Sequence, residues 1–244
     1  MCRWLLRVAL ASAIAIVPSP ALLWASGLQV SPIGLRLAAA APADALWLTN
    51  TGSETLHAQV RVYRWTQAGG KDVLDPTRDL VVSPPMVTIA PGDRQMVRVI
   101  RQVAPPADGT ETAYRVIVDE LPVGGNEKPG LKFVLRYSVP VFLSPAGDPT
   151  VKAALVATWE TTAAGPSLTV HNSGNGHAQI AEVSWTSSPQ SADSHMPGLV
   201  GYALPGASMS WKLPDGAPAG SGPVKARING ETSASTLVMG SNGR

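Results

Sequence analysis

Apolar and polar residues alternate along short stretches of the chain, and glycine, proline, asparagine and aspartate separate these stretches. The stretch 57–65 shows the pattern most strictly, because Gln59, Arg61 and Tyr63 fall on one side and Val60 and Val62 on the other. Period-two alternation bounded by turn residues predicts strands rather than helices. The expected strands of the N-terminal half lie at 28–38, 45–49, 57–65, 81–83 with 87–89, 96–100, 112–120 and 131–143. About seven short antiparallel strands predict an immunoglobulin-like sandwich.

The pattern restarts after 144–149, a short segment rich in proline and glycine that is typical of an elbow between domains. Residues 45–52 and 57–60 have an echo at 167–174 and 177–180, each with an Asn-x-Gly turn between two alternating strands. Such turns are common in sandwiches, so coincidence is the alternative to a repeated architecture. We expect an all-β protein with two immunoglobulin-like β-sandwich domains, at 27–145 and 146–244.

The first 26 residues have the pattern of a secretory signal peptide. Arg3 and Arg7 flank the start of an apolar run from Leu5 to about Val17, prolines break this run, and small residues follow at 25–27. A membrane anchor is the alternative, but a span needs roughly 20 apolar residues. We therefore expect cleavage near residue 25 or 26.

Loss of that segment changes the charge and the cysteine content. Cys2 is the only cysteine, so the mature chain would have neither disulfides nor a catalytic thiol. The chain has 19 Lys+Arg and 17 Asp+Glu, and removal of Arg3 and Arg7 leaves it formally neutral. A neutral protein has no general attraction to nucleic acid or anionic lipid, and no later segment is long enough to span a membrane. Neither nucleic-acid binding nor stable membrane insertion is expected.

Residues suited to catalysis or metal binding are scattered. Histidines occur at His57, His171, His177 and His195. A metal site needs further ligands at defined spacing, so we interpret these as solvated histidines at strand ends. Asp119 and Glu120 are adjacent on a strand and point to opposite faces, which favours a salt-bridged strand end. Without a nucleophile elbow or a phosphate loop, no catalytic residue, metal, cofactor or small-molecule substrate is expected.

Four segments of the N-terminal half match one family in order and spacing. They are 30–36, 83–85 with 89–98, 114–122 and 131–145. These segments resemble strands and turns of the PapD-like family, the periplasmic chaperones of chaperone–usher pilus systems. The resemblance covers about residues 28–145 and implies a periplasmic protein that is not an enzyme. Its implied partners are a pilin-like subunit and an outer-membrane usher.

The stretch 131–143 combines an apolar row with the length of an edge strand. Leu131, Phe133, Leu135 and Tyr137 share one face. A long apolar edge is normally an aggregation hazard, but it also suits β-augmentation of an incomplete partner sheet. The resemblance implies that Leu131, Phe133 and Leu135 enter a groove in a pilin, where each would contribute roughly 1.5–3 kcal/mol before ordering costs. The alternative is that they fill the core of their own domain.

The resemblance also implies that a first-strand arginine and a last-strand lysine bind the C-terminal carboxylate of the subunit. Arg36 matches the arginine, whereas Pro140 occupies the place of the lysine. Candidates for the missing partner are Arg98, Arg101, Arg136 and Tyr137. For each arginine the alternative is a solvated position on a strand.

The sequence thus predicts a chaperone that caps and stabilises pilin subunits by donor-strand complementation and delivers them to an usher. A secreted immunoglobulin-like adhesin or structural surface protein is the alternative. Co-purification separates the two, because a chaperone yields a stoichiometric complex with a pilin.

Overall fold

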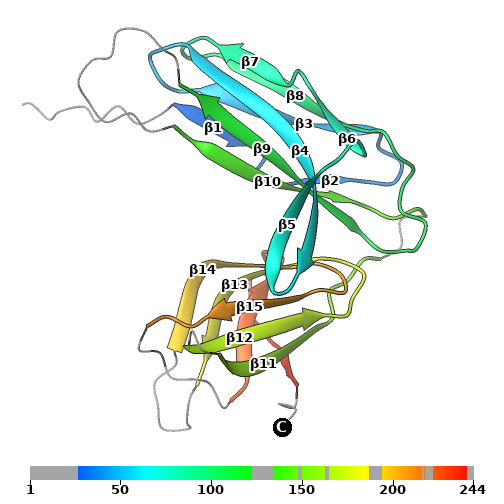
Figure 1. The fold of residues 1–244 in the computed structure, drawn as a ribbon, viewed down its shortest axis with the longest axis vertical. Helices are drawn as coiled ribbons and strands as arrows, with labels where there is room; N and C mark the ends of the chain where they lie inside the picture. The colour runs from blue at the N-terminus through cyan, green and yellow to red at the C-terminus, as the bar shows by residue number, and fades with distance from the viewer. Residues whose placement is uncertain are drawn as a thin grey trace, which may run out of the picture.

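The computed structural model describes residues 27–122, 134–147, 150–162, 165–186, 194–215, 217 and 222–240. The regular structure of these residues consists of strands in four sheets (Figure 1). Two sheets form a first sandwich from residues 28–143, and two form a second from residues 155–239. The prediction of an all-β protein with two immunoglobulin-like sandwiches is confirmed. No helix among the described residues has the length and hydrophobicity to cross a membrane.

The described residues of the first sandwich form ten strands. They are β1 (Leu28–Ser31), β2 (Leu35–Leu37), β3 (Ala43–Asn50), β4 (Leu56–Ala68), β5 (Lys71–Pro76), β6 (Leu80–Ser83), β7 (Met86–Ile89), β8 (Arg94–Arg101), β9 (Thr112–Leu121) and β10 (Arg136–Leu143). One sheet has the order β1-β3-β8-β6. The other has the order β2-β10-β9-β4-β5, with β7 also paired to β4.

The stretch 28–38, expected to be extended, forms two strands in different sheets. β1 pairs antiparallel with β3, whereas β2 pairs parallel with β10. Pro32 lies between them and has no N–H with which to continue the ladder of β1. The segment 28–37 therefore crosses from one sheet to the other, and this crossing brings Arg36 beside β10.

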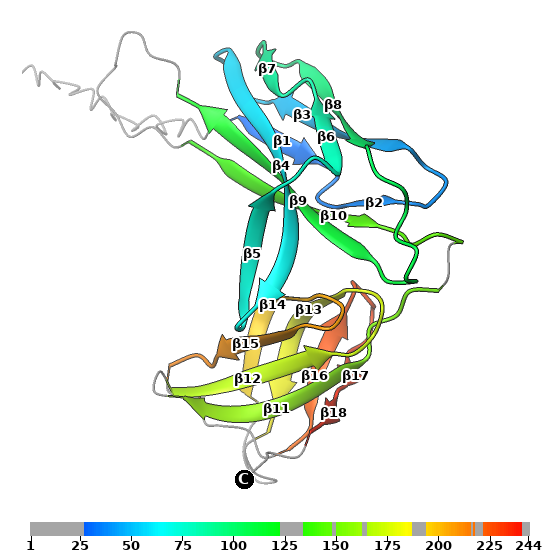
Figure 2. The ribbon, with the colours of Figure 1, turned by 45° about the vertical axis from the view of Figure 1, so that its right-hand side comes forward.

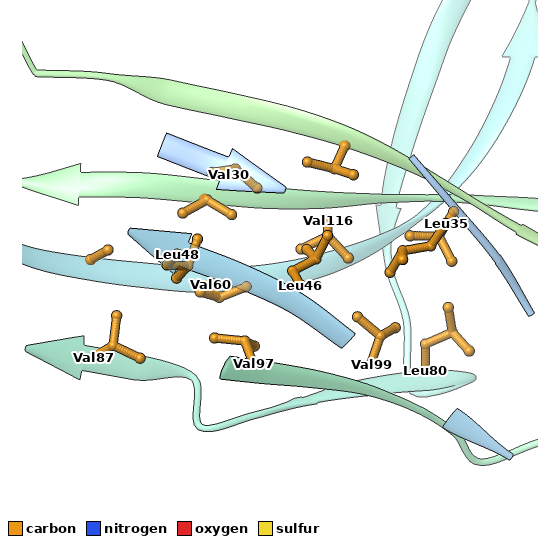
Figure 3. Close-up of a cluster of buried hydrophobic side chains, with 14 of the residues drawn as sticks. Val30, Leu35, Leu46, Leu48, Val60, Leu80, Val87, Val97, Val99 and Val116 are labelled. Carbon is orange, nitrogen blue, oxygen red and sulfur yellow. The ribbon is translucent and has the colours of Figure 1, made fainter. Parts of the chain in front are cut away.

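The core of the first sandwich follows from the alternation along its strands. Leu46 and Leu48 on β3 and Val97 and Val99 on β8 are fully buried and alternate with more exposed residues. Figure 3 shows these side chains facing Val60 and others from the opposite sheet. Burial of each such side chain contributes about 1.5–3 kcal/mol before entropy losses.

In the second sandwich, eight strands lie within the described ranges. They are β11 (Leu155–Thr162), β12 (Gly165–Asn172), β13 (Ala178–Trp185), β14 (Ser194–Ala203), β15 (Ser208–Lys212), β16 (Val224–Ile228), β17 (Ser235–Thr236) and β18 (Val238–Met239). Its sheets have the orders β15-β12-β11-β18 and β14-β13-β16-β17. The elbow expected at 144–149 lies between β10 and β11, with residues 148 and 149 outside the described part.

The repeated Asn-x-Gly turn has the same structure in both sandwiches. The Asn50 side chain accepts the Gly52 N–H at 2.9 Å and donates to the C=O of Ile89 at 2.9 Å. Asn172 likewise accepts from Gly174 at 3.0 Å and donates to Ala203 at 2.9 Å. Both asparagines are buried, where an amide needs such partners. The echo in the sequence thus reflects a shared way of closing each sandwich.

The two sandwiches touch through the β4–β5 hairpin and an apolar cluster. Figure 2 shows the hairpin reaching from the first sandwich to the second, where Gly70 bridges to Met209. Gly69 and Gly70 both have positive φ, which a tight two-residue hairpin turn requires. Behind the hairpin, Trp65 and Phe142 pack with Leu204 of the second sandwich.

Candidate functional site

The strand β10, along the lower margin of the first sandwich in Figure 1, is paired fully on one side and partly on the other. β9 pairs with β10 along its whole length, whereas β2 pairs only with Val141, Phe142 and Leu143. Among the described strands, none pairs with residues 136–140 on the side away from β9. We call this side of residues 136–140 the open edge. Such an edge presents N–H and C=O groups to another chain.

The apolar face of β10 points into its own sandwich. Val139, Val141 and Leu143 belong to the first core, and Leu135 and Tyr137 are half-buried at its end. Leu131 and Phe133, the other predicted donor residues, lie outside the described part. Leu135 therefore contacts its own core through part of its surface and has part left for a partner.

Arg136 is held at the start of the open edge by an ion pair. Asp119 on β9 accepts from the Arg136 Nε and from the Arg61 Nη2, the latter at 2.5 Å. Burial of Asp119 is the largest single effect and raises its pKa, but the hydrogen bonds and charges of Arg61 and Arg136 outweigh it, so the pKa lies below the ordinary value. The salt-bridged strand end predicted for Asp119 is confirmed. Beside it lies an open hollow of about 470 Å³, lined by residues of β4, β9 and Val134–Arg136.

The hydroxyl of Tyr137 already has a partner. It donates to the backbone C=O of Leu28 at 2.6 Å and so ties β10 to β1 across the two sheets. Arg136 and Tyr137 lie toward the end of β10 that is remote from Arg36, which is level with Phe142. Arg136 and Phe142 are six positions apart along the strand, or roughly 20 Å.

Arg36 lies at the margin of a crevice between the sandwiches. The crevice has a volume of about 270 Å³ and is lined by Arg64–Gln67, Asp108, Thr110–Ala113 and Leu204–Ala207. The Arg36 side chain is 52% exposed, and its Nη2 lies 3.5 Å from the Oε2 of Glu111. Glu111 is buried, and its Oε1 lies 2.6 Å from the Nδ1 of His177. The expectation that His177 is solvated is wrong, because this side chain is only 10% exposed.

Arg98 and Arg101 lie on β8, in the sheet that does not contain β2. Arg98 is exposed between the buried residues Val97 and Val99, and so faces outward from that sheet. Arg101 donates to the C=O of Ala39 at 2.8 Å and of Ala38 at 3.3 Å. The structure thus does not gather the candidate residues into one cluster, and Arg36 is the one in contact with the crevice residue Glu111.

Arg115 on β9 is a cation at this site that sequence reasoning missed. It pairs in register with Pro140, and its guanidinium lies 3.6 Å from the centre of the Trp65 ring and 5.0 Å from that of Tyr202. Burial lowers its pKa, but an arginine stays charged. Strand spacing places its Cα roughly 12 Å from that of Arg36. The strand register to Pro140 would have been needed to find it, and one sequence does not give that register.

Among the described residues, no group of three or more histidine, cysteine, aspartate or glutamate side chains is placed to hold a metal ion. The arrangement around β10 consists of a backbone edge that no described strand covers, the partly exposed Leu135 and cations, one of which, Arg115, donates to the Ser138 C=O at 3.4 Å. It offers groups for binding another polypeptide.

Comparison with known proteins identifies the family. The model of the pili and flagellar-assembly chaperone family, PapD N-terminal domain, matches residues 27–148, and the chain belongs to this family. Members of this family are non-catalytic chaperones of pilus assembly that work in the periplasm. No curated protein sequence matches the chain significantly.

Solved structures of similar fold include several pilus chaperones. A chain of the CsuC–CsuE complex, a chaperone with a tip adhesion subunit from the archaic Csu pili of Acinetobacter baumannii, is 26% identical with a TM-score of 0.68. The alignment covers 87% of this chain and 97% of that one. The SafA pilin–SafB chaperone complex of Salmonella enterica contains a chain with 17% identity and a TM-score of 0.61, covering 86% of this chain and 95% of that one. The CupB2 chaperone of Pseudomonas aeruginosa has 15% identity and a TM-score of 0.57, covering 85% of this chain and 97% of CupB2.

Proposed function

We propose that this protein is a periplasmic chaperone that caps pilin subunits by donor-strand complementation and delivers them to an outer-membrane usher. The observation that carries the proposal is the open edge of β10, which adjoins the partly exposed Leu135 in a chain of the PapD-like family. Residues 1–26 would be removed during export, and 27–145 and 146–244 would form the two domains.

The physical basis is β-augmentation. A subunit that lacks a strand would gain backbone hydrogen bonds from the open edge and apolar contacts from Leu131, Phe133 and Leu135. Neither nucleotide nor metal is required, because the folding free energy of the subunit drives capture. The Csu complex supports this proposal, because it is a structure of a chaperone with a tip adhesion subunit and contains a chain that is 26% identical to this one.

Two cations at the crevice end of β10 would bind the C-terminal carboxylate of the subunit. Arg36 is half exposed, and its ion pair with Glu111 is long, at 3.5 Å. Arg115 would take the role of the lysine that Pro140 replaces. An arginine fork suits a carboxylate, because it donates two parallel hydrogen bonds.

Site-specific crosslinking tests the proposal. A cysteine at Ser138 would be the only one in the mature chain, and it lies on the open edge. The Ser138→Cys variant, co-produced in the periplasm with a pilin-like subunit carrying cysteines at its groove, should form a disulfide-linked 1:1 complex. Arg98→Cys, exposed on the other sheet, is the matched control and should form none. Folded protein that neither co-purifies with nor crosslinks to the subunit would refute the proposal.

A further inference from the structure

Hydrogen bonds at the two ends of β10 show which residues face which neighbour. The Glu120 N–H donates to the C=O of Leu135 at 2.9 Å, so odd-numbered residues direct their backbone groups to β9. The Ser144 N–H donates to the C=O of Leu37 at 2.9 Å, on the opposite side. Because the register to β9 is continuous, Arg136, Ser138 and Pro140 all direct their backbone groups toward the open edge.

Pro140 stands where the open edge meets β2. The pairing of β2 with β10 begins at Leu35 and Val141. Every second residue of β10 bonds to β2, so the hydrogen bond from Ser144 to Leu37 predicts, four residues earlier, one from an N–H of residue 140 to the C=O of Ile33. Proline has no N–H, so the ladder ends there. Gly34 lies against Pro140, since a side-chain carbon at Gly34 would be 3.6 Å from the Pro140 Cγ.

We propose that Pro140 divides the outer edge of β10 into two parts. From Val141 onward the edge pairs with the chain's own β2, and from Ser138 backward it pairs with a strand of the captured subunit, which ends opposite Pro140. This inference rests on the proposed function. It makes Pro140 a positioning residue that stops β2 from covering the edge and fixes where the added strand ends.

Ile33 supports this division. Its side chain is 84% exposed, although it is a large apolar residue only two positions before β2. If β2 were extended by two residues, Ile33 would be level with Val139 and beside the open edge. The end of an added strand would therefore cover Ile33, which otherwise remains in water at a cost.

Amide hydrogen exchange of the wild-type protein in its complex with the subunit, without a crosslink and followed residue by residue by NMR, tests the proposal. Exchange at Arg136 and Ser138 should slow at least tenfold in the complex. Exchange at Tyr137 and Val139, which already face β9, should change little. A complex that forms without protection at Arg136 and Ser138 would overturn the inference but leave the proposed function standing. Failure to form any complex would overturn both.

Two variants test the role of the proline directly. In free Pro140→Ala protein the restored N–H should pair with Ile33, so the amide of residue 140 should exchange at least tenfold more slowly than an unpaired amide, and capture should slow. Rapid exchange of this amide with unchanged capture would overturn the proposal. Ser138→Pro removes an open-edge donor without removing a β9 hydrogen bond. It should melt within a few degrees of wild type and lose capture, whereas full capture would contradict the proposal.

Discussion

Glu111 of the first sandwich and His177 of the second meet at the crevice, where the His177 Nδ1 lies 2.6 Å from the Glu111 Oε1. The same oxygen accepts the His177 backbone N–H at 3.1 Å, and the imidazole stacks on Phe142 with 3.4 Å between ring centres. The other oxygen of Glu111 faces Arg36 at 3.5 Å. The buried carboxylate of Glu111 thus contacts both His177, where the two sandwiches meet, and Arg36, the candidate anchor.

Replacement of His177 by alanine should loosen the crevice without unfolding either sandwich. The variant loses the ring stack and one hydrogen bond to a buried carboxylate, a cost of about 1–3 kcal/mol. Small-angle X-ray scattering should show a broader range of distances between the sandwiches. His195→Ala is the control, because His195 is 52% exposed and pairs with Glu182 within the second sandwich. An unchanged scattering profile would mean that the remaining contacts, among them the β4–β5 hairpin and the packing of Trp65 with Leu204, hold the two sandwiches together without the His177 side chain.

Replacement of Arg36 by alanine should weaken subunit capture by more than the small loss of stability expected when Glu111 loses its ion pair. A charge-assisted hydrogen bond contributes about 1.5–3 kcal/mol, which corresponds to roughly a tenfold to hundredfold loss of affinity. The yield of subunit complex and the melting of the free protein would be measured together. Arg98→Ala should behave as wild type, since Arg98 faces outward from the other sheet. Equal yields from the two variants would rule out the anchor role of Arg36.

Replacement of Leu135 by alanine should affect both stability and capture. Leu135 is half-buried against the first core, so truncation should cost about 1–2 kcal/mol in the free energy of unfolding. Denaturant unfolding of the free protein measures this part. The loss of binding free energy for the subunit should exceed this loss of stability, because the exposed part of Leu135 would also lose contacts with the subunit. If the binding free energy falls by no more than the free energy of unfolding, Leu135 serves only its own core.

Local signals in the sequence predicted the strands and the two sandwiches. Alternation in 57–65 and the Asn-x-Gly turns depend on neighbouring residues, and β4 and the buried Asn50 and Asn172 confirm their meaning. These signals act over a few residues, so one sequence is enough to find them.

The site was predicted less well, because it depends on pairing between distant segments. Arg115 becomes a candidate only through its register with Pro140, and His177 is buried only because the second sandwich docks on Phe142. Likewise, Arg136 could be separated from Arg36 only once β2 was placed at the far end of β10. The register between strands that are distant in the sequence cannot be read from the residues of one chain.

Acid should weaken the start of the open edge through Asp119. The pKa of Asp119 in the folded protein lies below the ordinary value. Its ionised form therefore stabilises the fold fully above the unfolded-state pKa of about 4. This contribution is lost as the pH falls through the lower, folded-state pKa. Asp119→Asn should therefore lower the free energy of unfolding at pH 7. The cost should be about 1–2 kcal/mol, discounted because the two arginines are 42% and 68% exposed.

Denaturant unfolding at a series of pH values measures this contribution. The gap between wild type and Asp119→Asn should be constant from pH 7 to about pH 5 and should close below about pH 4, as the wild-type carboxylate becomes protonated. Asp215→Asn is a suitable control, because Asp215 also has a pKa lowered by a hydrogen bond, from Lys212, yet is exposed at the surface of the second sandwich. A gap for Asp119→Asn that persists unchanged into strong acid would show that the side chain acts there through its shape and not through its charge.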